Sequence, residues 1–178
     1  MRNPFRLTRW FAVLGFVTIA LVSVVSSYLL SRFMVSNVLH RDASVSMEFV
    51  QSTAEVQQAR NYFTGQRAAD TNLVEFFNHI STMPSVLRAN VFGADRTIIW
   101  SSDPSMIGRQ FEPNPELDQA LRGRLQIVLD KADWKPEHML LDLREEIVVE
   151  NYLPVRSGNE VIGVVELYKS PRTLFASV

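Results

Sequence analysis

The chain has 178 residues, 47% of them hydrophobic, and its 18 basic and 19 acidic side chains give a formal net charge of −1. This balance lacks the basic excess that is typical of a nucleic-acid-binding protein. The sequence contains no cysteine, which excludes a disulfide framework, a thiolate metal site and a thiol nucleophile.

The segment from Trp10 to Ser31 contains no charged residue over 22 positions. An α-helix of that length spans about 33 Å, which matches the hydrocarbon core of a bilayer. The run is longer than the apolar region of a cleaved signal peptide, and it lacks the polar face of a soluble core helix. We therefore predict a transmembrane helix over 10–31.

The charges that flank this segment predict its orientation. Arg2, Arg6 and Arg9 precede it, and no acidic residue stands beside them. Because positive flanks stay on the cytoplasmic side, we expect residues 1–9 to form a cytoplasmic tail. Residues 32–170 then lie outside the membrane, and the formal charge without the first 32 residues is −5.

Residues 33–66 lack proline and predict a long helix that continues from the membrane helix. Two offset series of residues recur there every seven positions, namely Val38, Val45, Ser52 and Ala59, and Val35, Asp42, Phe49, Val56 and Phe63. One interpretation is a stalk that pairs with a second copy in a homodimer. The other is a helix that packs on the sheet of its own domain.

The later elements indicate helices followed by an antiparallel sheet. In chain order we predict a helix over 72–81, strands over 86–92 and 97–101, a helix over 115–122, and strands over 126–129, 147–155 and 161–169. Asn114-Pro115-Glu116 is a strong helix start, and Gly123 is a typical helix end. Residues 131–146 predict irregular structure, and residues 156–160 a five-residue turn. The domain is therefore expected to be α+β.

The chain ends in a second helix start. Ser170 can cap a helix, with Pro171 at its first position. We expect residues 171–178 to begin a second membrane helix in a chain that continues.

The order of these pieces resembles a known family of sensor domains. A membrane helix and a long exit helix precede the stretch "MPSVLRANVFGADRTIIWSSDPSMIGRQF" and the strands "IVVENYLPV" and "VIGVVELYKSPRTLF". Over 33–169 the chain is similar to the Cache (PDC) group, the PAS-like extracytoplasmic sensors of bacterial histidine kinases, diguanylate cyclases and chemoreceptors. The Ile107-Gly108 turn and the hairpin around Gly163 are the most specific parts of this likeness.

The resemblance implies a PAS-like domain with a central antiparallel sheet of about five strands flanked by helices. It also implies a periplasmic location on a bacterial inner membrane and a small solute, such as a carboxylate or an amino acid, held between the sheet and its covering loops. The parent protein would be a two-component sensor histidine kinase or a diguanylate cyclase. We expect a homodimer through 33–66.

Side-chain alternation on the predicted strands suggests which residues line a ligand pocket: Arg88, Asn90, Trp100, Ser102, His138, Asn151 and Tyr152. Arg88 and Asn90 share a face and could clamp a carboxylate, or they could be a solvated face. Asn151 interrupts an apolar face and needs a partner from the protein or from a ligand. Trp100 could equally belong to the core.

No motif for catalysis is present. His40, His79 and His138 lack metal-ligand spacing, and the chain has neither a nucleophile elbow nor a phosphate-binding glycine loop. We therefore predict no catalytic residue, metal or cofactor in this region. The favoured function is the sensory input region of a membrane receptor. The alternative is a single-span docking subunit of an envelope complex that binds no small molecule.

Overall fold

The computed structural model describes residues 4–56, 59–64, 71–83, 85–110, 114–131 and 147–172. The chain divides into two compact units, Met1–Leu39 and His40–Val178. The first unit consists of the N-terminal part of helix α1 (Pro4–Val56), and the second contains a five-stranded sheet and its helices. The predicted α+β class, with a long N-terminal helix and an antiparallel sheet flanked by helices, is confirmed.

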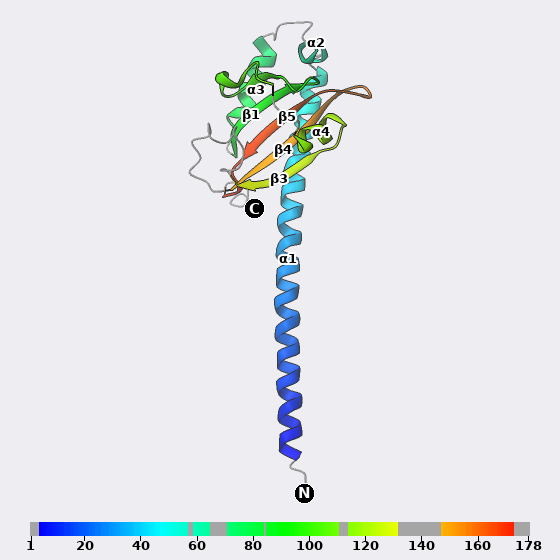
Figure 1. Ribbon diagram of the computed structural model, residues 1–178, viewed down its shortest axis with the longest axis vertical. Coiled ribbons are helices and arrows are strands. Elements are labelled where there is room, and N and C mark those ends of the chain that lie inside the picture. Colours follow the sequence, from blue (N-terminus) through cyan, green and yellow to red (C-terminus); the bar gives the residue numbers. More distant parts are fainter. Residues whose placement is uncertain are drawn as a thin grey trace. The chain divides into compact units, whose positions relative to one another are not determined.

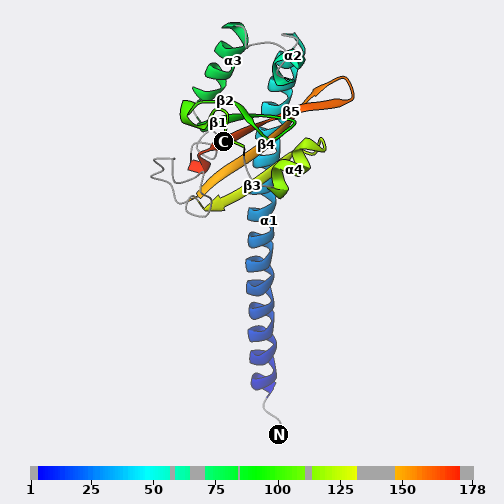
Figure 2. The same ribbon diagram turned by 45° about the horizontal axis from the view of Figure 1, so that its top comes forward.

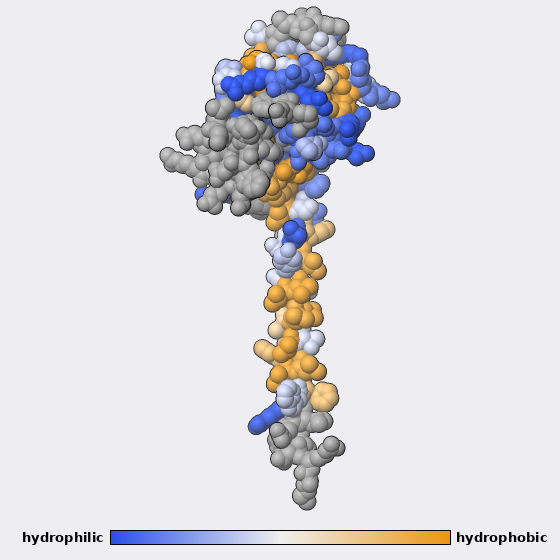
Figure 3. Space-filling view, in the orientation of Figure 1, coloured by the Kyte–Doolittle hydropathy of each residue, from blue (hydrophilic) through white to orange (hydrophobic). Residues whose placement is uncertain are grey.

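The first unit is a helix covered with apolar side chains. Trp10, Phe16 and Leu21 are each more than 60% exposed, and the most apolar stretch has a mean hydropathy of 2.2 with none of it buried. Figure 3 shows mostly orange, hydrophobic side chains along this part of α1. By length and composition α1 is able to cross a membrane, and it is the one such helix among the described residues.

The sheet has the strand order β2-β1-β5-β4-β3, and every neighbouring pair is antiparallel. Its strands are β1 (Val86–Gly93), β2 (Ile98–Ser101), β3 (Gln126–Lys131), β4 (Ile147–Ser157) and β5 (Glu160–Lys169). The central pairing joins β1 to β5, which lie far apart in the sequence (Figure 1). The last strand therefore lies in the middle of the sheet.

The turn between β4 and β5 is shorter than the sequence indicated. The strands extend to Ser157 and from Glu160, so two residues connect them and not five. Gly158 has a φ of 61°, a left-handed conformation that glycine adopts without steric cost. A tight hairpin therefore replaces the predicted five-residue turn.

One face of the sheet, which we call the α1 face, packs against helices. The C-terminal part of α1 from His40 onwards covers it together with α2 (Arg60–Phe63) and α3 (Thr71–Ser81), as the turned view in Figure 2 shows. Phe77 of α3 stacks on Trp100 with ring centroids 5.3 Å apart. Gly163 allows a close approach here, because a Cβ atom would overlap the Phe63 ring and the Phe92 carbonyl oxygen.

The opposite face, the α4 face, is covered in part by η1 (Pro104–Met106) and α4 (Pro115–Leu121). Asn114 caps α4 as predicted, since its Oδ1 accepts hydrogen bonds from the amides of Glu116 and Leu117. Leu117 and Ala120 of α4 are buried against this face.

The structure divides the predicted heptad positions between two roles. Ala59 and Phe63 are buried in the core of their own domain, and Asp42 pairs with Lys169 of β5. The positions that stay exposed are Val45, Phe49, Ser52 and Val56. Of the helix predicted over 33–66, α1 covers the part up to Val56, and the short helix α2 covers Arg60–Phe63. Packing on the domain's own sheet therefore accounts for part of the seven-residue pattern.

Several predictions fall on residues outside the described part of the chain. These are His138, the irregular structure over most of 131–146, and the end of the helix predicted over 171–178, of which Pro171 and Arg172 are described as helical.

Candidate functional site

A cluster of buried polar side chains lies on the α4 face of the sheet, and we call it the polar cluster. Its members are each no more than 4% exposed, and they are Arg88, Asn90, Ser101, Glu150, Tyr152, Glu166 and Tyr168. They come from four neighbouring strands. Polar groups are rarely buried in such number without a structural or a functional reason.

The neighbouring strands β4 and β5 carry the same short pattern. β4 contains Glu150-Asn151-Tyr152 and β5 contains Glu166-Leu167-Tyr168. Their antiparallel register places Glu150 opposite Tyr168 and Tyr152 opposite Glu166. Because alternate residues share a face, two carboxyl groups and two phenols meet in one interlocked group.

Glu166 is held by neutral hydrogen-bond donors. Asn90 Nδ2 donates to Glu166 Oε2 at 2.7 Å, and the Tyr168 hydroxyl donates to Oε1 at 2.9 Å. Asn90 is itself oriented by Ser101, whose hydroxyl donates to Asn90 Oδ1 at 2.7 Å. Burial raises the pKa of Glu166 to about 7, and the nearby Glu150 adds to this effect, whereas the Asn90 hydrogen bond opposes it.

Glu150 is connected to the start of helix α4. The Tyr152 hydroxyl donates to Glu150 Oε2 at 3.0 Å and lies 3.3 Å from Nδ2 of Asn114, the residue that caps α4. Burial raises the pKa of Tyr152 far above its ordinary value, so the phenol stays protonated and acts as a donor. The polar cluster is therefore joined to a helix that covers it.

Arg88 connects the cluster to the η1 turn. Its guanidinium lies 3.6 Å from Asp103 Oδ2, and only 3% of the Arg88 side chain is exposed. Asp103 caps η1, and its hydrogen bonds from Ser105 hold its pKa below the usual value. A buried guanidinium on a polar face can form paired hydrogen bonds with a carboxylate.

The structure brings three of the predicted pocket residues together and separates the others. Arg88, Asn90 and Tyr152 belong to the polar cluster. Ser102 is exposed at the end of β2, where its hydroxyl accepts a hydrogen bond from the Ala89 amide. Trp100 and Asn151 lie on the opposite, α1 face.

Asn151 has an unusual environment. It is 1% exposed, and neither its Oδ1 nor its Nδ2 has a hydrogen-bond partner among the described residues. Its neighbours on that face include Leu153 and, on β5, Leu167, which are part of the apolar core. An unpaired amide in such a place lowers the stability of the packing that contains it.

Sequence reasoning missed Ser101, Glu150, Glu166 and Tyr168. The repeated Glu-x-Tyr pattern on the last two predicted strands was a usable signal, because an antiparallel pair places such patterns on one face. Side-chain alternation could not predict the position of Ser101, because the register between β1 and β2 is irregular between Val91 and Phe92. That irregularity decides which β2 residue lies opposite Asn90.

The α1 face is linked to α1 by polar contacts at its edges. Lys169, at the end of β5, is 3% exposed and donates to Asp42 Oδ2 at 2.6 Å and to Ser46 Oγ at 2.8 Å. Near the other end of β4, Gln51 bonds both the amide and the carbonyl oxygen of Arg156. Helix α1 is thus attached to strands β4 and β5.

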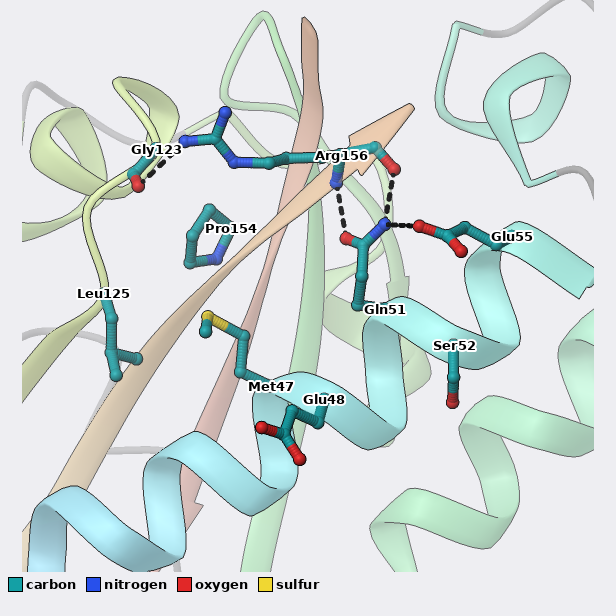
Figure 4. A pocket seen from close by; sticks show the side chains of 9 residues that line it. All are labelled: Met47, Glu48, Gln51, Ser52, Glu55, Gly123, Leu125, Pro154 and Arg156. Atoms are coloured by element: carbon teal, nitrogen blue, oxygen red, sulfur yellow. Dashed lines mark hydrogen bonds between the residues drawn. The ribbon is translucent and has the colours of Figure 1, made fainter. Parts of the chain in front are cut away.

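A groove of about 530 Å³ lies beside this second link (Figure 4). The residues that line it include the apolar Met47, Leu125 and Pro154 and the acidic Glu48 and Glu55 of α1. The Arg156 guanidinium extends over Gly123 and donates to its carbonyl oxygen at 3.1 Å. Gly123 has a φ of 84°, a left-handed conformation that favours glycine, and a Cβ atom there would displace the Arg156 guanidinium.

The chain was compared with protein families, with curated proteins and with solved structures. No family model and no curated protein matches the chain. Among solved structures, an extracellular ligand binding receptor from Desulfohalobium retbaense DSM5692 shares 17% identity with a TM-score of 0.47. The alignment covers 80% of this chain and 25% of that receptor.

Proposed function

We propose that this chain is the sensory input region of a membrane receptor. Residues 10–31 cross a bacterial inner membrane, residues 1–9 are cytoplasmic, and residues 32–170 form a periplasmic Cache-type sensor domain. The parent protein is a two-component sensor histidine kinase. The domain detects a small solute or a binding partner and transmits this state through α1.

The observation that carries this proposal is the Lys169 link. Strand β5 contributes Glu166 and Tyr168 to the polar cluster and ends at Lys169, which binds Asp42 and Ser46 of α1. Helix α1 also contains the apolar segment that is able to cross a membrane. Glu166 and Tyr168 of the polar cluster therefore lie within three residues of Lys169 on the same strand, so a change at the cluster arises close to the contact with α1.

The chemistry of the cluster suits a polar solute. Arg88 can bind a carboxylate, and the Glu150 and Glu166 carboxyl groups can accept hydrogen bonds from an ammonium group. A carboxylate or an amino acid is thus the favoured ligand class. Binding shifts the domain only if the solute has different affinities for two packings of the sheet against α1.

The test is thermal unfolding of the full chain in lipid nanodiscs with a library of carboxylates and amino acids. A solute that binds the folded state raises the melting temperature with saturation. We expect this shift to disappear in Arg88→Gln and to persist in Arg109→Gln, a matched change at an exposed arginine. A shift that survives Arg88→Gln contradicts the assigned site, and a library without effect favours the docking-subunit alternative.

We further propose that the receptor is a homodimer through α1. Val45, Phe49, Ser52 and Val56 are exposed and spaced alternately four and three residues apart, which is the a/d spacing of a coiled coil. Since the chain has no cysteine, Ser52→Cys should form a disulfide between two copies in the membrane, whereas Ser44→Cys, at a position off this seam, should not. Equal cross-linking of the two variants contradicts this interface.

A further inference from the structure

The two glutamates of the polar cluster can bind a proton as well as take part in binding an organic solute. Glu150 and Glu166 are 0% and 3% exposed, and they lie on neighbouring strands of one sheet face. Two carboxylates at such a site resist being charged together, because burial removes their hydration and each repels the other. The pair is therefore expected to take up and release a proton as a unit.

We propose that the domain senses proton concentration outside the membrane, and that the Glu150–Glu166 pair is the group that takes up the proton. This inference rests on the proposed receptor function and names its stimulus. It assigns the polar cluster a role that needs no organic ligand.

The groups that face Glu166 come from all the strands around it. From β1, Asn90 donates to it, and Arg88 lies two positions before Asn90 on the same face. From β4, Glu150 and Tyr152 face it. Tyr168 donates from β5 itself, Gln126 of β3 is paired with Tyr152, and α4 contributes the apolar Leu117 and Ala120.

Proton uptake must change the hydrogen bonds of this group. Glu166 accepts a hydrogen bond from Asn90 at Oε2 and from Tyr168 at Oε1, and Tyr152 also bonds this carboxyl group. When a proton from water adds to one oxygen, the carboxyl group gains a donor, and this donor needs an acceptor among its neighbours, so the hydrogen-bond pattern of the cluster changes. The pKa of about 7 places this event close to neutral pH.

The rearrangement lies next to the contact with α1. Tyr168, one of the donors to Glu166, is the immediate neighbour of Lys169 on β5. Lys169 in turn holds Asp42 and Ser46 of α1. Movement of Tyr168 along the strand therefore reaches the helix without an intermediate element.

The first test is the pH dependence of stability of the full chain in nanodiscs. Because the folded pKa lies above the ordinary value of 4.5, the stabilising contribution of neutral Glu166 is complete below about pH 4.5 and is lost as the pH rises through about 7. We expect the melting temperature to fall from about pH 5 to about pH 8, and this slope to flatten in Glu166→Gln. Glu75→Gln, at an exposed glutamate of α3, should keep the wild-type slope.

A second measurement follows movement of the helix. Because the chain has no cysteine, spin labels attach only at two introduced cysteines, Glu48→Cys on α1 and Asn159→Cys in the β4–β5 turn. Both sites are exposed. With labelled chains diluted in unlabelled ones, we expect the distance distribution to differ between about pH 5 and about pH 8, and this difference to vanish in Glu166→Gln.

The outcomes separate this inference from the receptor proposal. If Glu166→Gln keeps the wild-type slope of melting temperature, or if the label distance is the same at both pH values, proton sensing is wrong. Infrared titration of the unmodified chain gives a check that needs no variant, because a buried protonated carboxyl group must lose its carbonyl band near neutral pH. A solute that raises the melting temperature supports the receptor function alone and leaves these criteria unchanged.

Discussion

The two faces of the sheet are built from the same strands but differ in chemistry. On the α1 face, aromatic and aliphatic side chains such as Phe77 and Trp100 pack closely, and polar contacts stand at the edges. On the α4 face, an interlocked group of glutamates and tyrosines fills the centre of the sheet. The α1 face is thus suited to hold a helix in place, and the α4 face to bind or release something polar.

The largest effect on stability is expected when a large side chain is removed from the core on the α1 face. Phe77 is 2% exposed and contacts the rings of Phe63, Phe76, Tyr62 and Trp100. Phe77→Ala should lower the free energy of unfolding by about 3–5 kcal/mol through lost burial and a cavity. Denaturant titration measures this value. A loss below about 1 kcal/mol would mean that α3 does not pack on the sheet as described.

A smaller but more specific effect is expected at the Lys169 link. Asp42→Asn leaves the buried ammonium group without its carboxylate and should cost about 3 kcal/mol. Adding Lys169→Met removes the stranded charge, so the double variant should recover part of the loss. Denaturant unfolding of the two single variants and the double variant gives the coupling energy. Strictly additive losses would show that the two side chains do not interact.

The smallest predicted effect has the opposite sign. Asn151 is buried without a partner among the described residues, so Asn151→Leu should raise the free energy of unfolding by about 1–2 kcal/mol. The exposed Asn72→Leu is the matched control and should change little. Destabilisation by Asn151→Leu would indicate that a buried water or another group satisfies this amide.

Local signals in the sequence predicted most of the elements. Asn114-Pro115 determined the start of α4, and alternation identified β4 and β5 with small errors at their ends. These signals depend on neighbours within a few residues. The strands β4 and β5 extend further than predicted because Gly158, in its left-handed conformation, permits a two-residue turn in place of the predicted five-residue turn.

The composition of the polar cluster could be predicted only in part. Asn90 meets Glu166 because β1 pairs with β5, a contact between residues 76 positions apart that no local pattern encodes. The place of Trp100 depends on a register shift between β1 and β2, and a shift of one residue exchanges the faces. The heptad pattern of α1 was ambiguous for a related reason, since a helix can bury one stripe in its own domain and leave another exposed.

Asn114 connects the polar cluster to the first backbone amides of α4. Its Oδ1 holds the amides of Glu116 and Leu117, and its Nδ2 approaches the Tyr152 hydroxyl. When Tyr152 changes its hydrogen bonds, the cap of α4 has to adjust with it. Hydrogen–deuterium exchange at these two amides therefore follows events at the buried glutamates, with no label or substitution inside the cluster.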